Sequence, residues 1–176
     1  LRIKKENPHF TIPYKQWHCV NTIDIDNAFA YRGKGLFRNV GGFLRSLIGL
    51  QFTEIRDRLM VQLGQKSDPY DTYNYIIEKL SPYTKDTIVF FLVGDYGKLD
   101  KNLPWDNREF QKVVHRFASR FSVGLHPSAG SKNNPQTILV EKERLSSITG
   151  NNITKSRQHY LLLDMPNTYK ALIAAG

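Results

Sequence analysis

The sequence predicts an α/β fold in which parallel strands alternate with helices. Strand-like and helix-like segments follow one another along the chain, and the segment 88–93 is apolar at every position. A strand of that kind is typical of a sheet that helices cover on both faces. Unusual polar side chains also follow directly after the strand-like segments. In a parallel sheet the carboxyl ends of the strands lie at one edge, where ligands bind.

Four strands are expected, at 19–23, 87–93, 121–125 and 154–163. Apolar residues at a spacing of three and four predict the helices between and after them. Proline near a helix start and glycine after a helix end favour particular boundaries, such as Gly150 after the fifth helix. The helices are expected at 42–48, 54–63, from 67 onward, 108–119, 135–149 and from 166 to 176.

A chain of 176 residues is long enough for one domain with its own core, and 1–176 is interpreted as a single domain. Four β/α units are fewer than the eight strands of a closed β/α barrel, which usually takes about 250 residues. Two interpretations follow. Either the sheet is open, or the chain forms an incomplete, deformed barrel whose C-terminal strands lie beyond Gly176.

Composition excludes several classes of protein. The chain is 40% hydrophobic and 23% charged, which is typical of a globular protein. It has no apolar stretch of about 18 residues that could span a membrane, and no visible signal peptide, so the expected compartment is the cytoplasm. The single cysteine, Cys19, excludes an intramolecular disulfide and is expected to be a buried thiol.

The net charge of +9 raises the question of a nucleic-acid partner. The basic residues are spread along the chain, however, and the longest basic run is Lys4-Lys5. No helix carries a continuous basic stripe, so a nucleic-acid partner is not expected. Solvated helix faces explain most of the charge. Attraction to anionic substrates, such as acidic glycans or phosphorylated lipid carriers, is the functional alternative.

Asp24 and Asp26 stand two residues apart at the end of the first strand, so they point to the same side of a regular strand. Two close carboxylates repel one another unless a cation or an arginine lies between them. One carboxylate would then bind a metal while the other acts as a base. The alternative is that both serve the following turn.

Two further segments add histidines and an arginine at strand ends. His126 follows the third strand, where a neutral imidazole is a good zinc ligand, although a buried histidine bonded to a loop carbonyl is the alternative. Arg157 and His159 share one face of the expected fourth strand. Arg157 could orient a carboxylate by a bidentate contact, and His159 could ligate a metal, act as a general acid, or pack.

With these residues the chain resembles the polysaccharide deacetylases with NodB homology, carbohydrate esterase family 4, in a divergent bacterial branch. The first motif of that family is Thr-Phe-Asp-Asp-Gly. Here Thr22-Ile23-Asp24-Ile25-Asp26 is similar to a spaced variant of it. The resemblance, which covers residues 17–176, implies that Asp24 is the base and Asp26 a metal ligand.

The second motif, His-Ser/Thr-x-x-His, matches at His126, but Gly130 stands in place of its second histidine. Ser128 and Ser131 remain nearby as polar substitutes. The third motif, Arg-x-Pro-Tyr, is similar to Arg157-Gln158-His159-Tyr160, with His159 in place of proline. This departure suggests that His159 replaces the missing ligand.

The resemblance implies metal-assisted hydrolysis of an N-acetyl or O-acetyl group on a carbohydrate. A divalent ion, expected to be zinc, would polarise the acyl carbonyl and activate its water. Asp24 would remove a proton from that water, and Arg157 would orient Asp24. The expected sugar contacts are Asp95, Trp105, Ser128, Ser131 and Tyr160.

Two other functions compete with this one. A catalytically altered relative could bind glycan without hydrolysing it, and the glycine at position 130 favours that alternative. A basic nucleic-acid binder explains the charge but not the polar residues at the strand ends.

Overall fold

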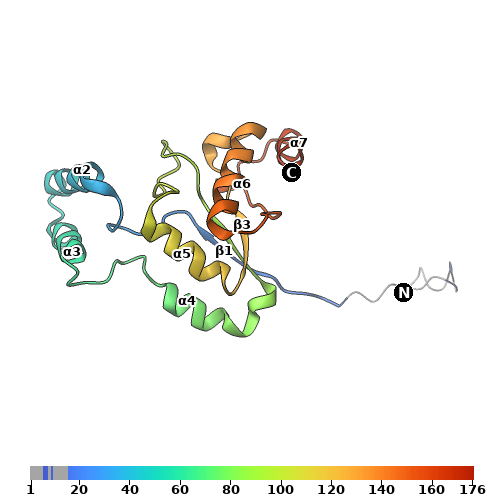
Figure 1. Ribbon diagram of the computed structural model, residues 1–176, viewed down its shortest axis with the longest axis horizontal. Coiled ribbons are helices and arrows are strands. Elements are labelled where there is room, and N and C mark those ends of the chain that lie inside the picture. The colour runs from blue at the N-terminus through green and yellow to red at the C-terminus, as the bar shows by residue number, and fades with distance from the viewer. Residues whose placement is uncertain (1–5, 8, 10–15) are drawn as a thin grey trace.

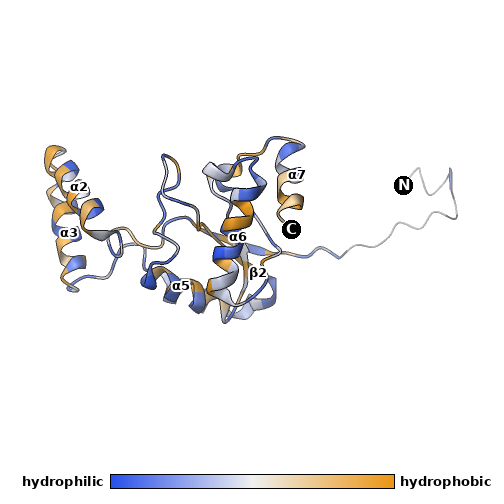
Figure 2. Cartoon of the chain, turned by 45° about the horizontal axis from the view of Figure 1, so that its top comes forward, coloured by the Kyte–Doolittle hydropathy of each residue, from blue (hydrophilic) through white to orange (hydrophobic). Residues whose placement is uncertain are grey.

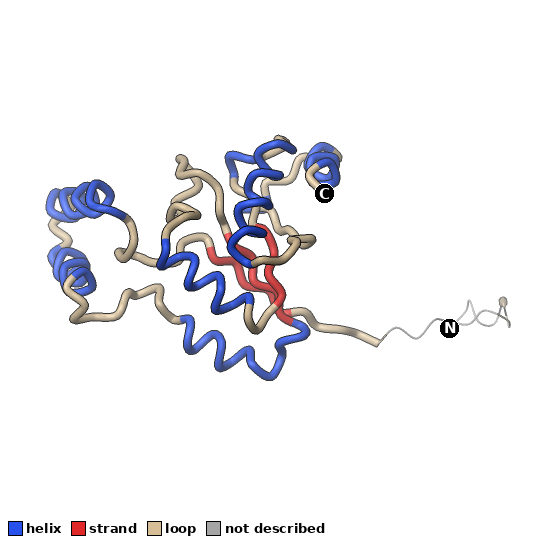
Figure 3. Tube along the Cα trace, in the orientation of Figure 1, coloured by secondary structure: helices blue, strands red, loops and turns tan. Residues whose placement is uncertain are grey.

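The computed structural model describes residues 6–7, 9 and 16–176. At its centre lies a three-stranded parallel sheet in the order β1-β2-β3 (Figures 1 and 3). The strands are β1 at Asn21–Ile25, β2 at Thr87–Phe91 and β3 at Ser122–Leu125. The mixed α/β class and the parallel strands that alternate with helices are therefore confirmed.

Within residues 16–176, six α-helices and three 3-10 turns accompany the sheet. The helices are α2 (Gly35–Ile48), α3 (Phe52–Gln62), α4 (Tyr73–Leu80), α5 (Arg108–Ala118), α6 (Pro135–Thr149) and α7 (Asn167–Ala174). The 3-10 turns are η1 (Ser81–Asp86), η2 (Ala129–Ser131) and η3 (His159–Leu161).

The core forms where one face of the sheet meets the helices. Phe91 on β2 lies edge-on against Phe110 and Phe117 of α5, with ring centroids 6.1 Å apart in both pairs. Tyr73 at the start of α4 meets Phe117 edge-on at 5.7 Å. Successive side chains point to opposite faces of a strand, so only every second residue can join this core. Ile25 of β1 and Phe91 of β2 are two that do.

Local signals explain why α5 and α6 begin and end where they do. The Asn107 side chain accepts hydrogen bonds from two N–H groups in the first turn of α5. The Asn134 side chain accepts one such hydrogen bond, from the N–H of Thr137 in α6, and Pro135 stands in the first turn of that helix. Gly150 ends α6 in the left-handed conformation, with φ of 70°. The expected range 135–149 is confirmed.

Several expected elements are corrected by the structure. Strand β1 begins two residues later than expected, which leaves Cys19 outside it and exposed. The expected strand 154–163 is wrong as a strand. A single parallel bridge joins Ser156 to Leu125, and the chain then turns into η3.

The helical boundaries after β1 also differ from expectation. Helix α2 begins at Gly35, seven residues before the expected start, and α4 begins only at Tyr73. Asp68 does not open a helix. Its carboxylate instead accepts backbone N–H groups from Ala30, Tyr31 and Arg32, and so ties the chain after β1 to the chain before α4.

Helices α2 and α3 stand to one side of the sheet and contact chiefly one another (Figure 1). Both carry apolar side chains that remain exposed, and Figure 2 shows these as hydrophobic stretches. Phe37, for example, is 92% exposed. None of the described helices combines the length and apolar character needed to cross a lipid bilayer.

Candidate metal centre

Three ligand-type side chains from distant parts of the chain meet beside the carboxyl ends of the strands. Asp26 follows β1, His126 follows β3, and His159 opens η3. One ligand atom from each lies within 4.8 Å of the others. The Nε2 atom of His126 is 3.1 Å from Asp26 Oδ1, and that of His159 is 3.6 Å from Asp26 Oδ2. Both imidazoles are buried, whereas Asp26 is exposed to solvent.

Backbone hydrogen bonds bring the two histidine segments together. The N–H of His126 donates to Phe91 O, so the chain continues the β2–β3 pairing past the end of β3. The N–H of His159 donates to Pro127 O at 3.1 Å. The Gln158 amide donates to Pro127 O and to Ser128 O. The segment before η3 is therefore held against the loop that carries His126, and the two imidazole ring centroids lie 5.0 Å apart.

Each imidazole faces an oxygen acceptor at Nδ1. His126 Nδ1 contacts the backbone carbonyl of Arg157, and His159 Nδ1 lies 2.9 Å from Asp100 Oδ1. A carbonyl or carboxylate can only accept, so both Nδ1 atoms carry the proton, and Nε2 of each neutral ring carries a lone pair. Those two lone pairs face the carboxylate of Asp26. Lone pairs and a carboxylate repel one another at this distance. Either a cation bound between the three groups or a second proton on each ring removes the repulsion.

Two nitrogen ligands and one carboxylate, each imidazole oriented through its other nitrogen, form the donor set of a divalent metal site such as zinc. The three residues therefore fit a metal ion. In the alternative without a metal, where the rings carry a second proton, the hydrogen bond from His126 lowers the pKa of Asp26, burial opposes this, and the charges of His126 and His159 lower it further. Asp26 is then ionised beside the two rings.

Asp100 is a residue of this site that sequence reasoning missed. It is buried, and besides facing His159 it accepts the N–H groups of Ala129 and Gly130 at 2.8 and 3.0 Å. Gly130, which stands where the resembled motif has a second histidine, thus helps to hold the carboxylate that orients His159. The sequence shows Asp100 only as one of several polar residues in the loop 96–107, with no signal that sets it apart.

Asp24 and Arg157 lie next to the three ligand-type residues. Arg157 Nη1 donates to Thr22 Oγ1 at 2.7 Å and lies 3.5 Å from Asp24 Oδ1. Both charged side chains are partly exposed. Asp24 and Asp26 together border an open hollow of about 380 Å³, which Tyr70 also lines. A ligand in this hollow would reach both carboxylates.

Ser128 and Ser131 are buried and hydrogen bonded to protein groups. Ser128 Oγ donates to the carboxylate of Glu141, and its backbone N–H donates to the other oxygen of that carboxylate at 3.0 Å. Ser131 Oγ donates to Ser128 O. Burial raises the pKa of Glu141, more than these bonds from Ser128 lower it. The structure thus uses both hydroxyls to fix the loop after His126.

The remaining sugar-contact candidates differ in their surroundings. Tyr160 is exposed, and its ring lies on that of His159 with centroids 4.2 Å apart. Its φ of 55° is unusual for a residue other than glycine. Asp95 forms an ion pair with Arg144 at 2.9 Å, and the Arg144 guanidinium lies 5.6 Å from the centroid of the Trp105 ring. Asp95 and Trp105 thus both lie beside Arg144.

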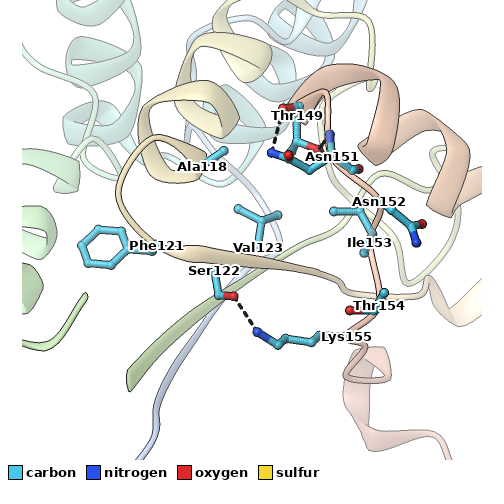
Figure 4. A pocket seen from close by; sticks show the side chains of 10 residues that line it. All are labelled: Ala118, Phe121, Ser122, Val123, Thr149, Asn151, Asn152, Ile153, Thr154 and Lys155. Atoms are coloured by element: carbon cyan, nitrogen blue, oxygen red, sulfur yellow. Dashed lines mark hydrogen bonds between the residues drawn. The ribbon is translucent and has the colours of Figure 1, made fainter. Parts of the chain in front are cut away.

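A second hollow, of about 260 Å³, lies at the opposite end of β3 (Figure 4). Ser122 begins β3, and its hydroxyl accepts a hydrogen bond from Lys155 at 2.6 Å. Thr149, the last residue of α6, and Asn151, just beyond it, close another side. No histidine or carboxylate lines this hollow, so it lacks the usual protein ligands of a metal ion.

Comparisons with models of protein families, with curated proteins and with solved structures find no match to this chain.

Proposed function

We propose that this protein is a metal-dependent hydrolase that removes acetyl groups from a carbohydrate, on an incomplete β/α barrel of the deacetylase type. The observation that carries the proposal is the convergence of Asp26, His126 and His159, with both imidazoles oriented by acceptors at Nδ1. The resemblance of the strand-end motifs to the polysaccharide deacetylases supports the acetylated-carbohydrate substrate.

In this proposal Asp26, His126 and His159 hold a divalent ion, with zinc favoured by the nitrogen ligands. The bound ion supplies Lewis-acid polarisation of the acyl carbonyl. Asp24 accepts the proton of the attacking water, because it borders the same hollow but is not one of the three converging groups. Arg157, whose Nη1 lies 3.5 Å from Asp24 Oδ1, orients the carboxylate of Asp24.

Metal binding tests the first step. Isothermal titration with zinc should show one site in the unchanged protein. The substitutions His126→Gln and His159→Gln should each weaken it strongly, because two remaining ligands bind poorly. His115→Gln is the matched control, since His115 is exposed on α5. Equal affinity in the His126 and His115 variants would refute the metal centre.

Acetate release from acetylated glycan oligomers tests the second step. Asp24→Asn should lower the rate by roughly 10²–10⁴-fold, the usual scale of general-base loss, while zinc affinity stays nearly intact. Asp26→Asn should lower both, and Asp106→Asn, at an exposed carboxylate elsewhere, should lower neither. If Asp24→Asn removes the metal, the assignment of Asp24 as base is wrong. Zinc binding without acetate release, together with glycan binding, would favour the altered relative.

A further inference from the structure

A third hollow, of about 490 Å³, lies between helices α2 and α3 and the loop after β2. It is lined by basic side chains. Lys34, Arg38 and Arg45 come from α2 and the residue before it, Arg58 from α3, and Lys101 from the loop. Five cationic groups around one depression repel each other unless an anion accompanies them.

Few acidic side chains accompany these cations. Glu54 lies 3.2 Å from Arg58, within α3. Among the described residues, the other four basic side chains have no carboxylate within ion-pair distance. Burial, followed by the charges of Arg38 and Arg58, lowers the pKa of Lys34, and the charge of Asp68 opposes this. The hollow therefore has a local excess of positive charge.

Arg58 is the buried cation among the five that line the hollow. The residue is 8% exposed, and its Nε atom is buried without a hydrogen-bond partner among the described residues. Its Nη1 and Nη2 atoms lie 2.7 Å from the place where a side chain at Gly42 would begin. Any larger residue at position 42 would displace the guanidinium. Glu54, Asn39 and the Tyr31 ring contact this guanidinium, but the buried Nε donor is left for a ligand, and a buried donor without a partner is costly.

Two more cations are held in position on the other side of the hollow. The guanidinium of Arg38 donates to the backbone carbonyls of Lys101 and Asn102, at 2.8 and 3.0 Å. It also lies 4.3 Å from the centroid of the Tyr96 ring, and the Lys101 ammonium lies 4.6 Å from the same centroid. These contacts limit the freedom of both side chains before any ligand arrives.

We propose that this hollow binds a phosphate-type oxyanion, either free or on a sugar or lipid. Arginine and lysine together offer several donors to the three outer oxygens of a phosphate group, and its double charge matches the local excess better than one carboxylate does. The site is separate from the candidate metal centre and does not depend on it. The two are joined through the loop, because Asp100 faces His159 and the next residue, Lys101, lines the hollow.

The neighbouring surface of α2 distinguishes a phosphate carried by a lipid from a free phosphate or a sugar phosphate. Leu36 and Phe37, beside Lys34, are exposed. Apolar side chains next to a cationic hollow suit a phosphate that carries a lipid chain. A free phosphate or a sugar phosphate needs the cations alone.

The test uses the whole chain and three probes: inorganic phosphate, pyrophosphate, and phosphatidylcholine vesicles with or without phosphatidic acid. The decisive variant is the double substitution Lys34→Gln and Arg45→Gln. Neither side chain has a hydrogen bond or ion pair to a described residue, so the fold should be kept, and circular dichroism checks this. The matched control is Arg56→Gln with Lys170→Gln, which removes the same charge from exposed positions outside the hollow.

Saturable binding of phosphate or pyrophosphate is expected by calorimetry. Each lost contact should weaken it about tenfold, and the control should bind as the unchanged protein does. A second supporting outcome is binding only to the vesicles that contain phosphatidic acid. If the Lys34/Arg45 variant loses this binding and the control keeps it, the hollow binds the phosphate of a lipid headgroup. Equal weakening by both double variants would overturn the proposal, because it would show attraction by net charge. Absence of binding to all three probes would overturn it too.

Discussion

The strand-end region and the α2–α3 region both gather charged side chains, but they support them differently. At the strand ends His126 is oriented by a backbone carbonyl and His159 by a buried carboxylate, which is itself held by two backbone N–H groups. Around the α2–α3 hollow, Lys34 and Arg45 have no such partner among the described residues. The helices there pack chiefly against each other.

This difference indicates what each region is built to do. Groups fixed by a second layer of hydrogen bonds keep one geometry, which metal binding and catalysis require. Around the α2–α3 hollow, contacts hold Arg38 and Arg58, whereas Lys34 and Arg45 are free to adjust to a ligand. Helices that pack chiefly against one another also open locally at low cost. We therefore expect a fixed geometry at the strand ends and a partly adjustable one at the hollow.

The largest effect should come from the core beneath the strand-end region. Phe117 is fully buried and contacts the rings of Phe91 and Tyr73, so Phe117→Ala should lower the free energy of unfolding by about 3–5 kcal/mol. Phe37→Ala, on the exposed face of α2, should change it by no more than about 0.5 kcal/mol. Urea denaturation measures both. Comparable losses would mean that the apolar face of α2 is covered in solution.

The next effect concerns the support of His159. Asp100→Asn removes the charge that faces His159 Nδ1 and should weaken zinc affinity by about 10–100-fold, the usual cost of losing such a partner. Calorimetry gives the affinity, and Asp106→Asn is the control. Unchanged zinc binding would show that the backbone alone orients His159.

A third effect depends on pH. Burial by itself would raise the pKa of Asp68, but hydrogen bonds from the N–H groups of Arg32, Tyr31, Ala30 and Tyr70 lower it below its usual value. A carboxyl with a lowered pKa in the folded state adds stability above its unfolded pKa, near 4, and this stability is lost as pH falls through the folded value. Asp68→Asn should therefore cost about 1–3 kcal/mol at neutral pH.

The difference between Asp68→Asn and the unchanged protein should shrink in acid, in urea titrations carried out below about pH 4. A constant difference across pH would show that the charge of Asp68 is not what ties the chain after β1 to the chain before α4.

The smallest effect compares two left-handed glycines. Gly150 ends α6 and Gly35 begins α2, both with φ of 70° and with open space for a methyl group. Alanine should cost about 1 kcal/mol at each because of the backbone conformation. At Gly150 the loss should appear in global unfolding. At Gly35 it should appear as faster hydrogen exchange in α2 alone, and a global loss there would show that the helical pair unfolds with the sheet.

Local signals in the sequence determined a good part of this structure. The apolar spacing and the asparagine, proline and glycine at the ends of α5 and α6 act within a few residues, so those two helices could be predicted closely. The three parallel strands and the position of Asp26 and His126 just after two of them also followed from sequence, because the ends of parallel strands share an edge. The choice of Asp26, His126 and His159 as ligands remains a prediction until metal binding is measured.

Tertiary structure decided what depends on partners far along the chain. Asp100 became part of the site because folding places it against His159, 59 residues away, and no local pattern marks that pair. The segment after α6 reads as a strand, but it forms one bridge, at Ser156, and then turns into η3. The basic residues of α2 and α3 read as solvated helix faces, and only the packing of α2, α3 and the loop after β2 gathers them around one hollow. Residue type and spacing encode local conformation, whereas burial and charge balance arise only when distant segments meet.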